Sequence, residues 1–199
     1  MEQKPARVRL VDAAHQLMLT KGLARTTTKE IAKAAGCSEA ALYKHFLSKE
    51  ELFVVVLQER LPTIDLRELT ADPGTGERSV EENLTVIARQ AALFYEQSFP
   101  IAASLYAEPR LKERHDAAMR DMGRGPHLPI RGVATYLRAE QTAGRVRADA
   151  DTYAAASLLL GACAQRAFAY HATATGEPPQ PLDDFAASVA RTLLRGLAE

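Results

Sequence analysis

The chain has 199 residues, 47% of them hydrophobic and 25% charged, and is long enough for one or two domains with a hydrophobic core. No apolar run approaches 18 residues and the first helix carries charge from Lys4 onward, so we expect no membrane span, no signal peptide and a cytoplasmic protein. The two cysteines, Cys37 and Cys163, lie far apart and indicate neither a disulfide framework nor a metal site.

The zero net charge hides an uneven distribution along the chain. Residues 1–49 carry nine Lys or Arg against four acids, a net charge of +5, and the remaining 150 residues carry −5. A basic end attached to an acidic body is typical of a protein that meets a polyanion. Chance placement of surface charge is the alternative, and +5 alone does not exclude it.

Capping signals divide the N-terminal region into short helices. A first apolar helical pattern, beginning near Leu10, should end at Gly22. Thr27–Glu30 forms a capping box that opens a second helix, which ends at Gly36. Ser38 should then cap a third helix over residues 39–46, and Ser48–Glu51 reads as a capping box for a fourth.

Two short helices joined by a tight glycine turn and braced by a longer helix indicate a helix-turn-helix. In its second helix, Leu42 and Phe46 can face a core together, which leaves Tyr43, Lys44 and His45 on the exposed face. Hydroxyl, ammonium and imidazole groups suit phosphate oxygens. This pattern therefore predicts contact with the DNA backbone.

The rest of the chain also reads as helical. Pro62 should end or kink the fourth helix, and residues 70–78 have the composition of a mobile loop. The Ser79–Glu82 pair restarts a helix with a regular apolar stripe. Weaker helical segments over 100–122, broken near Pro109, precede a loop over 123–129 and a helix over 130–143.

Two C-terminal segments favour a dimer interface. Residues 151–174 form a helix that is apolar on two sides and so must be buried on two sides. The last helix, after Pro181, has one apolar face, and helices rich in small residues can pack closely in an intermolecular four-helix bundle. The interface residues that we predict are Leu158, Gly161, Ala162, Phe185, Val189 and Leu193. Packing into the chain's own core is the alternative.

Large, mostly apolar side chains supply candidates for a small-molecule pocket. They are Phe94, Tyr95, Phe99, Tyr106, Met119, Met122, Tyr136 and Phe168. Aromatic residues at helical spacing are more often part of a core than of a pocket. Arg166 interrupts the long apolar helix, and it either pairs with an acid at an interface or meets an anionic effector.

Enzymatic chemistry has no support in the sequence. The five histidines show no metal-ligand spacing, and no phosphate loop or nucleophile motif is present. We therefore expect no enzyme, no cofactor and no metal.

The N-terminal motif closely resembles the DNA-binding head of TetR-family transcriptional regulators. The pattern Thr-Thr-x-x-Ile-Ala-x-x-Ala-Gly-x-Ser is followed by Leu-Tyr-x-His-Phe-x-x-Lys-x-x-Leu, and the match covers roughly residues 7–57. The resembling positions are Thr27, Thr28, Ile31, Ala32, Ala35, Gly36, Ser38, Leu42, Tyr43, His45, Phe46, Lys49 and Leu52. The remaining chain matches the family only in length and helical character.

This resemblance implies an all-α homodimer with a three-helix DNA-binding head and a larger helical domain for effector binding and dimerisation. The corresponding domains would be residues 1–48 and 49–199. By position, the DNA contacts implied are Thr27, Thr28, Lys29, Ser38, Glu39, Ala40, Tyr43, Lys44, His45 and Lys49. Glu39 either accepts from a base such as cytosine or remains a solvated acid in the first turn of its helix.

Two functions remain in competition. In the first, the protein is a repressor released from a palindromic double-stranded operator by a small, largely apolar effector. In the second, it is a DNA-binding co-regulator whose helical body is a protein-interaction module without an effector.

Overall fold

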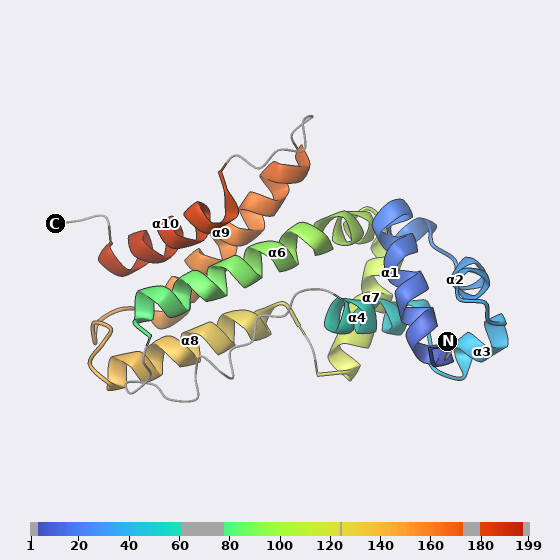
Figure 1. Cartoon of the computed structure of the whole chain (residues 1–199). Helices are drawn as coiled ribbons and strands as arrows, with labels where there is room; N and C mark the ends of the chain where they lie inside the picture. Colours follow the sequence, from blue (N-terminus) through green and yellow to red (C-terminus); the bar gives the residue numbers. More distant parts are fainter. Residues whose placement is uncertain (1–3, 61–77, 124, 173–179, 197–199) are drawn as a thin grey trace. The chain divides into compact units, whose positions relative to one another are not determined.

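The computed structural model describes residues 4–60, 78–123, 125–172 and 180–196, and all the regular secondary structure in these ranges is helical (Figure 1). Predictions for Pro62 and for residues 70–77 lie outside the described residues. The chain divides into two compact units. The first unit comprises residues 1–61 and 97–125, and the second comprises residues 62–96 and 126–199.

The first unit contains α1 (Ala6–Arg25), α2 (Thr28–Ala34), α3 (Glu39–Tyr43), α4 (Lys49–Glu59), α7 (Pro109–Asp121) and the end of α6 (Val80–Tyr106). Its core joins buried side chains from all of these helices, including Leu10, Ile31, Leu42, Phe53 and Leu111. The predicted helix-turn-helix is thus packed on α1, α1 packs on α4, and α7 packs against α4 from the far part of the sequence.

The first helix continues beyond its predicted end. Gly22 has φ 76° and ψ 164°, so the helix kinks there, but a further turn follows to Arg25. The hydroxyl of Thr26 donates to the carbonyl of Gly22 over 2.8 Å and fixes this kink. Glycine acts here as a kink because the chain resumes helical geometry around the buried Leu23.

Three of the predicted caps are present as full or partial boxes. Thr27 and Glu30 form a complete capping box, as do Ser79 and Glu82. Ser48 accepts from the Glu51 N–H, but the Glu51 carboxylate accepts from the Leu47 N–H instead of that of Ser48. The capping oxygens still satisfy amide groups that a helix start leaves unpaired.

The third helix is shorter than the predicted 39–46. It starts as expected after Ser38, which accepts from the Ala41 N–H, but it ends at Tyr43. The N–H of His45 then bonds to the Leu42 carbonyl three residues earlier, which tightens the backbone into a turn. This turn brings Phe46, only 2% exposed, into the core of the first unit.

The second unit is formed by α8 (His127–Thr142), α9 (Thr152–Ala172), α10 (Leu182–Arg195) and the first part of α6. Its core combines Leu84 and Ile87 of α6, Tyr136 of α8, Leu159 of α9 and Ala186 of α10. Figure 1 shows α9 beside α10, and the two pack directly. None of the described helices is both long and apolar enough to span a membrane.

A proline inside α6 leaves one backbone carbonyl of this helix without its usual N–H partner, and a side chain of α9 lies within hydrogen-bond distance of that carbonyl. Pro100 lies inside α6 and has no N–H to give to the carbonyl of Glu96, four residues earlier. The Nε2 of His171 in α9 lies 2.8 Å from that carbonyl, which can accept its hydrogen. The helix therefore continues through Pro100, where the sequence suggested only weaker helical segments.

Arg166 pairs with an acid of its own chain. The side chain is 3% exposed and forms an ion pair with Glu96 of α6. It also donates to the Gln180 carbonyl over 2.9 Å, and its guanidinium carbon lies 5.2 Å from the centre of the Phe185 ring. Of its two predicted roles, pairing with an acid is thus present, within one unit of the chain.

Candidate nucleic-acid interface

The helix-turn-helix presents a mainly polar surface that comprises the start of α2, the helix α3 and the residues next to α3. Exposed or half-buried side chains make up this surface: Thr27, Thr28, Lys29, Ser38, Glu39, Ala40, Tyr43, Lys44 and His45. Because Gly36 adopts φ 62°, a conformation that favours glycine, the chain turns sharply between the two helices. The structure therefore brings together nine of the ten residues predicted to contact DNA. Contact with DNA itself stays a prediction.

Hydrogen bonds join the start of α2 to α3. The Thr28 hydroxyl donates to a Glu39 carboxylate oxygen over 2.5 Å, and the Tyr43 hydroxyl lies 3.4 Å from the same Thr28 oxygen. Neither of the two readings of Glu39 from the sequence included this contact. It joins α3 to α2 within the first unit.

Lys49, the tenth residue, differs from the others. Its ammonium donates to the carbonyls of Leu23 (3.0 Å) and Thr26 (3.1 Å), at the end of α1. Burial lowers the pKa of the Lys49 ammonium. In this structure Lys49 supplies a donor to the Thr26 carbonyl and a second donor to the Leu23 carbonyl, which the Thr26 N–H also reaches over 3.3 Å.

A groove of about 350 Å³ adjoins this surface within the first unit. Its lining includes Thr28 and Tyr43 from the polar surface, together with Lys49, Glu50 and Arg114. Arg114 belongs to α7, and its guanidinium lies 3.1 Å from the carboxylate of Glu50, which is 5% exposed. Sequence analysis missed Arg114, because nothing local to residues 109–121 indicates that α7 packs beside α4.

The predicted effector residues are divided between the two units. Phe99, Tyr106, Met119 and Met122 belong to the first unit, and Phe94, Tyr95, Tyr136 and Phe168 belong to the second. Tyr106 is 71% exposed and Phe168 is 57% exposed. Tyr136 is fully buried in the core, where the Asn83 amide donates to its hydroxyl over 3.0 Å. Burial, the largest effect, raises the pKa of Tyr136 to about 12.

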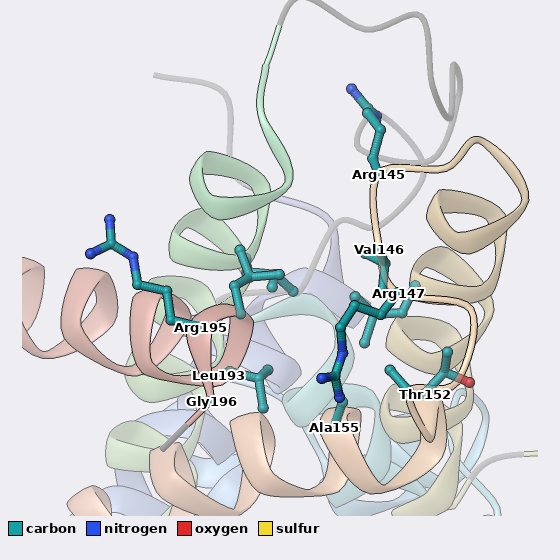
Figure 2. Close-up of a pocket in the computed structure, with 12 residues that line it drawn as sticks. Arg145, Val146, Arg147, Thr152, Ala155, Leu193, Arg195 and Gly196 are labelled. Carbon is teal, nitrogen blue, oxygen red and sulfur yellow. The ribbon is translucent and has the colours of Figure 1, made fainter. Parts of the chain in front are cut away.

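A cavity of about 400 Å³ lies elsewhere in the second unit (Figure 2). The turn between α8 and α9, the C-terminal end of α10 and Leu84 of α6 surround it. None of the eight predicted effector residues lines this cavity. Its charged lining consists of Arg145, Arg147 and Arg195, which the sequence analysis did not single out.

The predicted dimer residues divide into exposed and half-buried positions. Leu158 is 67% exposed and Gly161 is also exposed, whereas Ala162, Phe185, Val189 and Leu193 are half-buried. Phe185, Val189 and Leu193 pack partly against their own unit's core. A groove of about 420 Å³ with mainly apolar walls runs between Leu158 and Leu159 of α9 and Val189 and Leu193 of α10.

Two family models match the chain. The model described as "Bacterial regulatory proteins, tetR family" matches residues 10–56, and "AefR-like transcriptional repressor, C-terminal domain" matches residues 82–196. The first match contains all nine residues of the polar surface of α2 and α3. The second covers more than half of the chain.

Curated relatives match over part of this chain, and the chain spans less than a third of the length of the first of them. An uncharacterised HTH-type regulator, YvkB of Bacillus subtilis, is 43% identical over 56 residues, which cover 28% of this chain and 30% of YvkB. The uncharacterised HTH-type regulator TtgW of Pseudomonas putida is 36% identical over 97 residues, or 49% of this chain and 69% of TtgW.

Solved structures match over nearly the whole length. A TetR-family regulator structure from Mesorhizobium loti has a TM-score of 0.70 at 22% identity and covers 98% of both chains. The regulator FadR from Bacillus subtilis, solved in complex with stearoyl-CoA, has a TM-score of 0.68 at 15% identity and covers 96% of this chain and 99% of its own. At these identities the likeness concerns the fold alone.

Proposed function

Because the chain belongs to the TetR family of DNA-binding transcriptional regulators, whose members are not enzymes, we propose that it is a repressor released from its operator by a small molecule. The observation that carries this proposal is the polar surface of α2 and α3, fixed by the bonds among Thr28, Glu39 and Tyr43. A helix-turn-helix with these groups pre-positioned can place α3 in a major groove.

The polar surface supplies groups for both kinds of DNA contact. Lys44 and His45 are exposed donors for phosphate oxygens, and Ala40 leaves room for the backbone to approach base edges. Arg114 lies on the adjoining groove, and it adds a cation from α7 that can reach a phosphate once Glu50 releases it. DNA contacts therefore extend, in our proposal, beyond the predicted head of residues 1–48.

If the chain forms a dimer through α9 and α10, the operator that it recognises should be palindromic. Leu158 and the groove beside it form an exposed apolar surface on these two helices. A second copy with the same surface would cover it in an isologous contact. Two heads related by a two-fold axis read two half-sites one DNA turn, or a multiple of a turn, apart.

Effector release is the remaining part of the proposal. The AefR-like match is described as a repressor domain, and the FadR neighbour holds stearoyl-CoA on the same fold. Both support a repressor whose domain over residues 49–199 takes a largely apolar effector. A ligand can release DNA only by binding the state with low DNA affinity more tightly, and a difference of about 1.4 kcal/mol gives a tenfold effect.

The test combines a melting-temperature screen with DNA binding by the full-length protein. A ligand present at 100 times its Kd should stabilise the folded state by about 2.7 kcal/mol. We expect hits that raise the melting temperature also to weaken binding to a selected DNA site. Hits that leave DNA affinity unchanged would contradict effector release and favour the co-regulator alternative.

A further inference from the structure

The cavity of Figure 2 has apolar walls contributed by helices that are distant in sequence. They consist of Leu84 from α6, Leu137 from α8, Val146 from the α8–α9 turn, Ala155 from α9, and Leu193 and Leu194 from α10. A volume of about 400 Å³ lies in the range of small-molecule sites, about 300–1,000 Å³. The walls suit an alkyl chain, because burying each CH₂ group contributes about 0.8 kcal/mol.

One of the three arginines is neutralised inside the protein. Arg145 forms two hydrogen bonds of 2.6 and 2.8 Å to the carboxylate of Glu140, which is fully buried. In Figure 2 its side chain extends away from the cavity, and so does that of Arg195. Arg145 therefore balances a buried charge and shapes the turn, and it is not a ligand contact.

Arg147 is the cation that faces the apolar space. In Figure 2 its side chain extends from the α8–α9 turn in the direction of Leu193 and α9. Its partner Asp149 lies 3.5 Å away, and the two side chains are 81% and 79% exposed. Exposed pairs of this kind contribute little free energy, so an anion held beside an apolar wall can displace Asp149.

From this arrangement we propose that the cavity binds an amphiphilic anion, with the alkyl chain against the leucines and a terminal carboxylate on Arg147. The site is separate from the aromatic and methionine residues predicted to line an effector pocket. Guanidinium groups recognise carboxylates by paired hydrogen bonds, which a neutral head group of the same chain length cannot reproduce.

The experiment is isothermal titration of the full-length protein, without DNA, with octanoate, 1-octanol and butyrate. We expect octanoate to bind at least tenfold more tightly than 1-octanol, which lacks the charge, and than butyrate, which lacks most of the chain. Arg147→Gln should weaken octanoate binding about tenfold, or 1.4 kcal/mol, and leave 1-octanol unchanged.

Arg138→Gln is the matched control, because Arg138 is an exposed arginine of α8 that does not line the cavity. It should bind octanoate like the unsubstituted protein. Ala155→Leu, which fills the cavity, should weaken octanoate and 1-octanol together. Absence of octanoate binding, or equal octanoate affinity in Arg147→Gln and Arg138→Gln, would overturn the proposal. Since DNA is absent, either result leaves the proposed repressor function standing.

Discussion

Tyr43 and Lys44 differ from Lys49 in what their polar atoms do in the unbound protein. Tyr43 is 50% exposed and Lys44 is also exposed, so their side chains can meet a phosphate without breaking the fold. Lys49 instead donates to two carbonyls of α1. Sequence position alone assigned all three to DNA contact, and the structure separates them.

The double substitution Tyr43→Ala and Lys44→Ala should leave helix content unchanged and weaken binding to all DNA sequences. Each lost phosphate contact should reduce the slope of log K against log salt concentration by about one unit. Fluorescence anisotropy at several salt concentrations measures both quantities. Arg131→Ala, an exposed change on α8, serves as the control. Unchanged affinity and slope in the double variant would show that this surface does not dock on DNA.

Lys49→Met should destabilise the first unit. Removing the ammonium takes its donor from the Thr26 carbonyl, at a cost of about 1–3 kcal/mol, whereas the Leu23 carbonyl keeps the bond from the Thr26 N–H. Urea unfolding measures the loss, and Lys44→Met should show none. If Lys49→Met keeps full stability but loses DNA binding, a phosphate contact becomes its main role.

At the scale of single helices, the capping box of α2 connects stability to pH. The ammonium of Lys21, the largest cause, and the N–H and hydroxyl of Thr27 lower the pKa of Glu30 to about 2. As pH falls from about 4.5, the unfolded chain takes up this proton first. The stabilisation is therefore complete above pH 4.5 and is lost as pH falls toward 2.

Glu30→Gln tests this connection, because glutamine can still cap Thr27 but carries no charge. Below pH 4.5 the variant should lose less stability than the unsubstituted protein, as measured by urea unfolding at pH 6, 4 and 2.5. Parallel pH profiles for the two proteins would mean that the charge of Glu30 contributes nothing.

Helix starts could be predicted from the sequence because capping is local. Thr27, Ser38 and Ser79 each bond to an amide three residues on, and all three starts are confirmed. Where a helix stops or continues depended instead on contacts with residues distant in the sequence. The chain stays helical through Pro100, where His171 can satisfy the freed carbonyl, and α3 stops early so that Phe46 can enter the core.

The second-unit cavity and the α7 contribution could not be predicted from the sequence. Arg147 faces an apolar space only because α10 and α6 pack around the α8–α9 turn. Arg114 meets Glu50 across 64 positions of sequence. No local sequence pattern indicates either contact, whereas the polar residues of the helix-turn-helix lie within the 19 consecutive residues from Thr27 to His45 and share recognisable spacing.

At the scale of the whole molecule, the proposed dimer has an exposed position that tests it cleanly. Leu158 is 67% exposed, so Leu158→Glu should not disturb the fold of one chain, whereas a change at the half-buried Val189 would. In a dimer seam the carboxylate would be buried without a partner, at a cost of several kcal/mol. Sedimentation should therefore show a folded monomer with weakened operator binding.

The matched control for the dimer is Thr142→Glu, at an exposed position of α8 outside the proposed interface. It should sediment like the unsubstituted protein. A Leu158→Glu protein that remains a dimer would exclude this face of α9.

If a dimer reads DNA through α2 and α3, the full-length protein should select an inverted repeat from a random library of DNA duplexes. We expect the half-site centres of the enriched repeat to be about 10–10.5 base pairs, or a multiple of this spacing, apart. The Tyr43 and Lys44 double variant should enrich the repeat far less. No enriched sequence, or an asymmetric site that the variant enriches equally, would show that a dimer does not read DNA through these helices.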